Sequence, residues 1–266
     1  MYTPVNYLFV LVTVLFLNSA CGGSSDSDSS ASTVGSATPS FVADTKNGAN
    51  LKATLTNFNF KPENLGQAST SQQEGYLELV LNGNVHSRLY GSWLYLSKTQ
   101  LKDGDNEAYF NLKDTNHQTI GSSSKITYHF HESSDGHSHG KPVQRLNSSG
   151  NMSHSHGMVM VQEGQAVPSI SIDMTKDSVS GYNLKFSLEN YTLTPENVNL
   201  ENVFGEGHMH LYINDEKITR LYEPWHHISS LSTGENKVRV ELSANDHSVY
   251  SYQGNTIDAT TMVTVP

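Results

Sequence analysis

The sequence predicts an all-β protein made of two tandem β-sandwich domains. Two observations predict this fold: the chain contains an internal repeat, and both copies consist of short alternating runs rich in β-branched and aromatic residues. Gly, Pro, Asn and Asp separate the runs, which is the pattern of an antiparallel β-sandwich. No segment shows convincing helical periodicity, and the "PEN" after "LT" in the second copy predicts at most one helical turn.

The composition restricts the class of partner. The 266 residues carry a formal net charge of −10, and 36% of them are hydrophobic, which is enough to build cores. No cluster of Lys and Arg could neutralise a row of phosphates, so we expect no nucleic-acid binding. Small cations are the better partners.

The first residues resemble a bacterial lipoprotein signal. Leu8 to Leu17 is an apolar run too short to span a membrane but long enough for the hydrophobic core of a secretory signal. It is followed by "LNSACGG", which resembles the site where a cysteine, here Cys21, is lipidated and becomes the mature N-terminus. The resemblance implies a signal peptide over residues 1–21 and a lipid-anchored protein of the bacterial cell envelope, facing the periplasm or the cell surface. The alternative is a plain secretory signal with an incidental buried cysteine.

The next segment has the composition of a linker. Residues 22–40 are rich in Ser, Gly, Asp and Thr and contain no aromatic residue. Such a segment cannot bury enough apolar surface to fold, so it predicts a flexible tether. Folding should begin near Phe41.

The internal repeat sets the domain organisation. Three pairs of segments align, the third with two extra residues in the first copy: Asn50–Leu65 with Asn183–Val198, Gly75–Leu96 with Gly207–Ile228, and Gly104–His117 with Gly234–His247. The shared residues include Arg88/Arg220, Leu89/Leu221, Tyr90/Tyr222 and Trp93/Trp225. We therefore predict homologous domains over residues 41–132 and 167–266, each resembling the immunoglobulin-like or cupredoxin-like class.

Residues 133–166 join the two copies and are rich in histidine and methionine. Two H-S-H-G motifs stand in Ser- and Gly-rich surroundings, so we expect a mobile loop, with "MVMV" as an extra strand. A loop gives its histidines no scaffold, so metal binding there would be weak and exchangeable, and the alternative is a polar spacer. The auxiliary ligands would be His137, His139, His154, His156 and Met158, and His129 and His131, which share one strand face, would extend the patch.

Comparison of the copies separates scaffold from function. Positions that both copies share are demanded by the common scaffold, whereas differences are free to serve function. Four histidines are specific to the second copy: His208, His210, His226 and His227 correspond to Tyr76, Glu78, Leu94 and Tyr95. His247 matches His117, which favours a structural role, although it remains a candidate ligand.

The segment "GEGHMHLYIND" predicts a metal site. Side chains alternate along a strand, so His208 and His210 face one surface, while Met209 faces the other as a core residue. Together with His226 or His227 they would form an imidazole site, a ligand type that suits Cu, Zn and Ni. The alternative is a set of solvated or ligand-contacting histidines.

The stretch "GEGHMHLYINDEKITRLYEPWHHISSL", with "SGYNLKFSLENYTLTPENV" before it, resembles a domain found in many exported bacterial proteins. The resemblance implies a β-sandwich in the cell envelope and, by likeness to periplasmic copper carriers, His-based copper binding. Mixed imidazole and thioether groups in the linker favour copper over zinc, because zinc sites seldom use Met. The cupredoxin electron-transfer pattern is not met, since no Cys follows the histidines to supply a thiolate.

These observations predict a lipid-anchored envelope protein that binds copper, with zinc or nickel as alternatives, for capture or delivery. We expect no enzymatic activity, because the sequence has no thiol beyond Cys21, no phosphate loop and no serine elbow. The competing hypothesis is a non-enzymatic interaction or adhesion module of two immunoglobulin-like domains that binds an envelope protein or a glycan.

Overall fold

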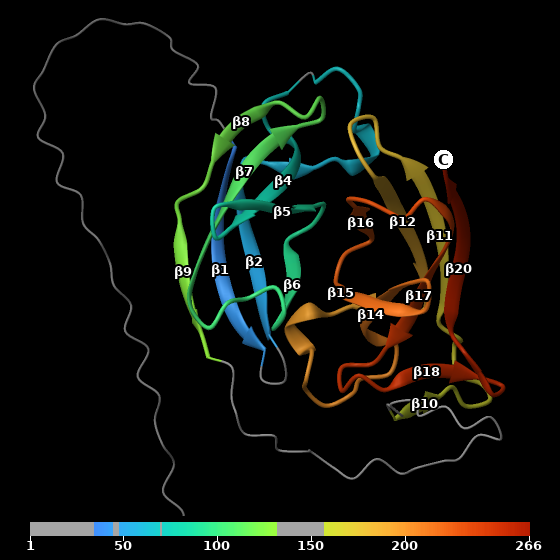
Figure 1. Ribbon diagram of the computed structural model, residues 1–266. Coiled ribbons are helices and arrows are strands. Elements are labelled where there is room, and N and C mark those ends of the chain that lie inside the picture. The colour runs from blue at the N-terminus through green and yellow to red at the C-terminus, as the bar shows by residue number, and fades with distance from the viewer. Residues whose placement is uncertain (1–34, 45–47, 70, 132–156) are drawn as a thin grey trace, which may run out of the picture. The chain divides into compact units, whose positions relative to one another are not determined.

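The alternating runs form strands because their apolar side chains face the inside of a sandwich while their polar side chains face solvent. The computed structural model describes residues 35–44, 48–69, 71–131 and 157–266 (Figure 1). Within these ranges the regular elements are strands and two single-turn 3-10 helices, without an α-helix. No helix of the described residues is long and apolar enough to cross a membrane. The predicted all-β fold is confirmed.

The first copy forms a sandwich of two sheets. One sheet has the strand order β1-β2-β6, and the other has the order β3-β4-β7-β8, with β5 paired to β4 and β9 paired to β7. The strands are β1 (Ser36–Asp44), β2 (Gly48–Thr56), β3 (Asn59–Phe60), β4 (Glu74–Leu81), β5 (Asn84–Leu89), β6 (Trp93–Ser97), β7 (Gly104–Asp114), β8 (Thr119–Ser122) and β9 (Ile126–Phe130), and the 3-10 turn η1 (Pro62–Asn64) follows β3.

The second copy repeats this arrangement with additions. One sheet has the order β11-β12-β16, and the other has the order β10-β18-β17-β14-β13, with β15 on β14, β19 on β18 and β20 on β17. The elements are β10 (Met158–Met160), β11 (Ser169–Lys176), β12 (Tyr182–Glu189), β13 (Thr192–Leu193), η2 (Pro195–Asn197), β14 (Glu206–Ile213), β15 (Glu216–Leu221), β16 (Trp225–Ile228), β17 (Gly234–Ser243), β18 (Val249–Tyr252), β19 (Asn255–Thr256) and β20 (Asp258–Val265). The "MVMV" segment therefore supplies a strand, β10, which pairs in parallel with β18.

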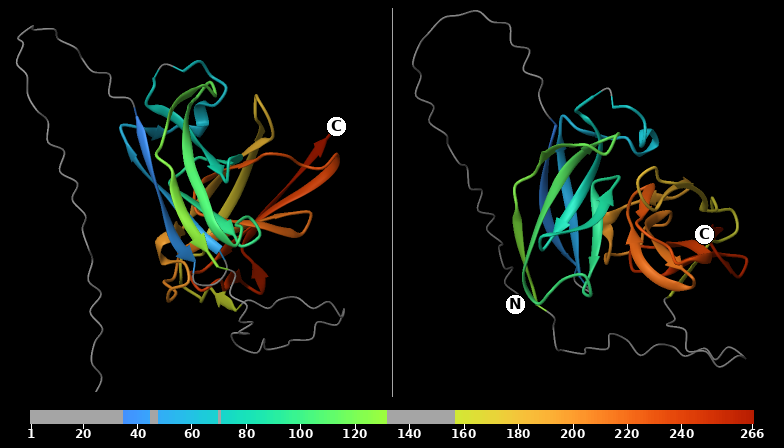
Figure 2. Two further views of the ribbon diagram at one scale, coloured as in Figure 1. Left: turned by 60° about the vertical axis from the view of Figure 1, so that its left-hand side comes forward. Right: turned by 45° about the horizontal axis from the view of Figure 1, so that its top comes forward.

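Each sandwich encloses its own hydrophobic core. Leu51 of β2 and Leu77 of β4 are fully buried in the first core. Their counterparts in the alignment, Leu184 of β12 and Met209 of β14, are fully buried in the second core. Figure 2 shows the blue-to-green strands of the first copy gathered in one sandwich and the yellow-to-red strands of the second copy gathered in another. The repeat in the sequence is thus a repeat of packing.

Reciprocal contacts join the two sandwiches, which belong to one unit of the chain. Each copy contributes an arginine and a tyrosine, and each presents an aspartate and an asparagine to the other copy. The pairs are Arg88–Asp177 (3.0 Å), Arg220–Asp44, Tyr90–Asn183 (2.7 Å) and Tyr222–Asn50 (2.9 Å). The arginine and tyrosine that both copies carry in "RLY" are therefore retained for contact between the copies.

Candidate metal centre

Strand β14 places two of the predicted ligands side by side. His208 and His210 project from the same face of β14, while Met209 between them points into the second core, as the strand periodicity predicts. Both imidazoles are fully buried; the ring of Tyr222 packs edge to face against His208. The two rings lie edge to face with their centroids 4.7 Å apart.

A tight turn brings a third histidine to this face. His247 lies between β17 and β18, where its N–H donates to the carbonyl oxygen of Ala244 (3.0 Å). Its φ of 73° falls in the left-handed region, which few residues other than Gly enter, although Asn, Asp and His are enriched there among the rest. This backbone conformation holds the His247 ring 4.7 Å from the ring of His208 and 6.1 Å from that of His210, centroid to centroid.

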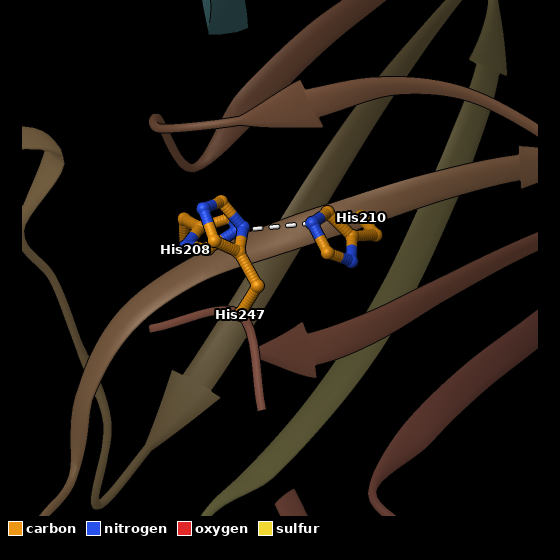
Figure 3. Close-up of side chains that lie close together, drawn as sticks. All are labelled: His208, His210 and His247. Atoms are coloured by element: carbon orange, nitrogen blue, oxygen red, sulfur yellow. Dashed lines mark hydrogen bonds between the residues drawn. The ribbon is translucent and has the colours of Figure 1, made fainter. Parts of the chain in front are cut away.

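The three histidines form a compact donor set, which we name the triad (Figure 3). One ligand nitrogen from each of His208, His210 and His247 lies within 4.8 Å of the others. The two Nε2 atoms of β14 are 3.0 Å apart and share a hydrogen bond. Metal–imidazole bonds are about 2.0 Å long, so two nitrogens on one tetrahedral ion are separated by roughly 3.3 Å. Small movements of the rings would bring all three nitrogens onto one ion.

Two neighbouring side chains contact the rings of His247 and His210. The Oδ1 atom of Asn199 lies 2.8 Å from His247 Nε2, and an amide oxygen only accepts, so His247 Nε2 carries the proton and Nδ1 keeps its lone pair. Ser243 Oγ lies 3.1 Å from His210 Nδ1, on the far side of the ring from the Nε2 that faces His208. Partners of this kind orient imidazoles in metal sites and set their tautomers.

The surroundings of His210 favour its neutral imidazole. Burial lowers the pKa of His210 well below its usual value, and the proximity of other groups that can carry positive charge, His208 and Lys217 first among them, lowers it further. Burial also lowers the pKa of Lys217 to about 8, with a further contribution from Arg220. Lys217 Nζ lies 3.1 Å from His210 Nε2, at the edge of the triad. Neutral imidazole is the form that binds a metal ion, so the His210 ring needs no loss of charge to bind one at neutral pH.

The structure does not bring His226 or His227 to the triad. Both lie on β16, which pairs with β12 in the other sheet of the second sandwich. There the ring of His227 contacts the interface: its Nδ1 lies 2.9 Å from Asn183 Oδ1 and 3.4 Å from the phenolic oxygen of Tyr90. Burial lowers the pKa of His226 to about 4 and that of His227 to about 3. His247, rather than this pair, completes the histidine cluster.

The other predicted ligands fall into two groups. Met158 begins β10 opposite Val249 and is 56% exposed, so its thioether faces solvent and is not part of the triad. His137, His139, His154 and His156, together with the predicted lipidation residue Cys21, lie outside the described residues.

Sequence reasoning missed three residues beside the triad. Asn199, Ser243 and Lys217 all differ from their counterparts in the first copy, which are Gly66, Lys113 and Val85. Comparison of the two copies singled out the histidines. The same comparison, applied to all polar residues, would also have found Asn199, Ser243 and Lys217.

Comparisons with known proteins give little further information. No family model and no curated protein matches the chain. A solved structure described as "Structures of Clostridium thermocellum CbhA fibronectin(III)-like modules" is 9% identical in sequence, covering 82% of this chain and 86% of that chain, with a TM-score of 0.23. A TM-score this low has no bearing on function, and the fold stands on the strand pairings themselves.

Proposed function

We propose that the chain is a transition-metal-binding protein that holds one ion, copper in the leading case, at His208, His210 and His247. The observation that carries the proposal is the convergence of three buried imidazoles with their ligand nitrogens within 4.8 Å of one another. Two rings come from one strand and the third from a turn with a left-handed backbone, and Asn199 and Ser243 orient them.

The donor set supports copper by affinity rather than by ligand type. Imidazole suits copper, zinc and nickel alike, but among divalent first-row ions a given nitrogen site binds Cu²⁺ most tightly. Met209 points into the core, so the strand that carries two of the ligands supplies no thioether. Zinc is therefore the alternative that a titration must separate from copper.

Burial of the triad supports binding rather than turnover as the role. His208 and His210 are 0% exposed and His247 is 7% exposed, so a bound ion would be shielded from solvent and substrates. Such a site suits capture and later handover of an ion. With the lipid anchor predicted at Cys21, the protein would hold the ion at a membrane surface of the cell envelope.

The decisive experiment uses the two copies as each other's control. His247 and His117 occupy equivalent turns with φ values of 73° and 65°, and Asn tolerates this region, so H247N and H117N should both fold. Titration with Cu²⁺ and with Zn²⁺, followed by calorimetry and elemental analysis, should show one tight equivalent in the unmodified chain and in H117N. H247N should lose that step and keep only weaker binding.

A tight step that survives in H247N contradicts the triad as the site. If no protein shows a tight step with either ion, the non-enzymatic interaction module becomes the leading function, and the search moves to a protein or glycan partner.

A further inference from the structure

A second set of metal-ligating side chains lies on the first sandwich, away from the triad. Strand β9 alternates: Ile126, Tyr128 and Phe130 pack against the first core, while His129 on the strand and His131, one residue beyond its end, are exposed. The inward residues hold the strand, so His129 is presented from it and His131 follows directly after it. Two positions along a strand correspond to roughly 7 Å, which places the two rings next to each other.

Each of these imidazoles faces a carboxylate, Asp105 on β7 or Asp103 just before that strand. His129 pairs with Asp105 in the register of β7 and β9, and its Nδ1 lies 2.7 Å from Asp105 Oδ1. Just past the ends of the two strands, His131 Nδ1 lies 3.2 Å from Asp103 Oδ1. The result is a two-by-two array of imidazoles and carboxylates on an open surface, which we name the β9 array.

The bonding pattern of the β9 array is that of metal-binding histidines. A carboxylate that accepts a hydrogen bond from Nδ1–H fixes the tautomer and leaves the lone pair on Nε2. Histidines that bind a metal through one ring nitrogen usually donate the other N–H to a carboxylate in this way. We propose that the β9 array binds a divalent late transition-metal ion such as Cu²⁺ through Nε2 of His129 and His131. This site does not depend on the triad, and because its side chains are exposed it would exchange its ion readily.

The second copy provides an internal control for this proposal. Its β20 pairs with β17 as β9 pairs with β7, and Glu235 matches Asp105 in the alignment. Opposite Glu235 stands Thr264, and no histidine occurs on β20. The scaffold therefore needs neither imidazole at this edge. The outward acid Glu107 of β7 is ion-paired with Lys125 at 2.7 Å, whereas Asp105 and Asp103 pair with the two histidines.

The experiment is a titration of the full chain with Cu²⁺, followed by paramagnetic broadening of backbone amide signals. In the unmodified protein, amides of residues 103–106 and 127–131 should broaden at low copper. H129N/H131N should lose this local broadening. D103N/D105N should keep the ligands but bind roughly tenfold to a hundredfold more weakly, the usual consequence of removing the groups that orient metal-bound histidines. These side chains are exposed, so the variants should fold, and their spectra check that.

The matched control is H137N/H139N. His137 and His139 are two residues apart, as His129 and His131 are, but they lie outside the described residues. It should leave the broadening at β7 and β9 unchanged. Local broadening that persists in H129N/H131N, or that never develops in the unmodified chain, overturns the proposal. Equal affinity in D103N/D105N would overturn the role of the carboxylates. Because the readout is local to β7 and β9, a failure of the triad to bind metal leaves this result unaffected.

Discussion

In both sandwiches a left-handed turn places a histidine, His117 or His247, beside the strand β4 or β14, and we call this place the corner. The side chains at the corner differ between the two copies. In the first copy, His117 occupies the turn, and its Nδ1 lies 3.1 Å from the phenolic oxygen of Tyr76 on β4. Glu78, two residues along, accepts from Asn111 Nδ2 at 3.0 Å and lies 3.6 Å from Lys113 Nζ. Tyr76 and His117 thus partner each other, and Glu78 partners both Asn111 and Lys113.

In the second copy the turn and its left-handed histidine are kept, but β14 carries His208 and His210 in place of Tyr76 and Glu78. Three imidazoles then meet where the first copy has one. The comparison teaches that the histidine of the turn is part of the inherited scaffold and that two substitutions on the neighbouring strand convert a structural contact into a donor set. A residue present in both copies can therefore still join a candidate donor set in one of them.

The largest expected effect comes from converting the second corner into the first. H208Y/H210E should abolish tight metal binding, because a phenol and a carboxylate replace two of three imidazoles. The fold should survive, since Tyr76 packs against His117 in the same geometry and Lys217 lies within reach of an acid at position 210. Metal content after dialysis and the near-ultraviolet circular dichroism spectrum test both statements. Tight binding by this variant would mean that the ion lies elsewhere.

The next largest effect concerns the reciprocal ion pairs that join the copies. The side chain of Asp44 is fully buried, so D44A should destabilise the protein by about 3–5 kcal/mol by leaving the Arg220 guanidinium without its counter-ion. D44A/R220M should recover part of that loss, because the charge is removed as well. Urea denaturation measures both. A change below about 1 kcal/mol in D44A would show that this contact is weak and that the copies are held mainly by the tyrosine–asparagine pairs.

A smaller effect is expected from Asn199, which positions His247. Asn199 has a φ of 72°, and its counterpart Gly66 has a φ of 81°, so N199G should keep the backbone while removing the hydrogen bond to His247 Nε2. Metal affinity should fall roughly tenfold to a hundredfold with one equivalent still bound. N190G is the matched control, since Asn190 is also left-handed but hydrogen-bonds to the carbonyl of Val167. Equal losses in both variants would indicate a general loss of stability.

His227 of the second copy should make the stability of the protein depend on pH, whereas its counterpart in the first copy, Tyr95, should not in this range. Burial, with a smaller contribution from Arg88, lowers the pKa of His227 to about 3, against about 6.5 for an unfolded chain. The unfolded state then binds the proton more readily, so this contribution to stability is complete above pH 6.5 and declines as the pH falls towards 3. The other charged or titratable groups around the ring are Asp177, His226 and His117.

H227Q should therefore flatten the decline in stability between pH 6.5 and 4.5, by up to about 1 kcal/mol per pH unit. Urea midpoints measured across this range, with H129Q as a control at an exposed histidine, test the expectation. Parallel curves for H227Q and the unmodified chain would contradict it.

The alternation of side chains along each strand predicted the fold and part of the site correctly, whereas the sequence did not predict which histidine joins His208 and His210. The repeat and the alternation of side chains predicted the all-β fold, the shared face of His208 and His210, and the core position of Met209, because these properties follow from the strand itself. The third histidine of the triad depends on which sheet each strand joins. The pairing of β16 with β12 is a long-range choice that carries His226 and His227 to the facing sheet, and no spacing in the sequence encodes it.

The smallest expected effect tests whether sulfur has any part in the folded site. Met209 and Leu77 are equivalent, fully buried residues of the two cores. The exchanges M209L and L77M conserve volume, so each should change stability by less than about 1.5 kcal/mol. Because Met209 points away from the triad, M209L should bind Cu⁺ and Cu²⁺ with unchanged affinity. If M209L instead weakened Cu⁺ binding tenfold while leaving Cu²⁺ binding alone, the thioether would have to reach the ion. Such a result would require β14 to twist locally on binding, and the two corners would then differ in backbone as well as in side chains.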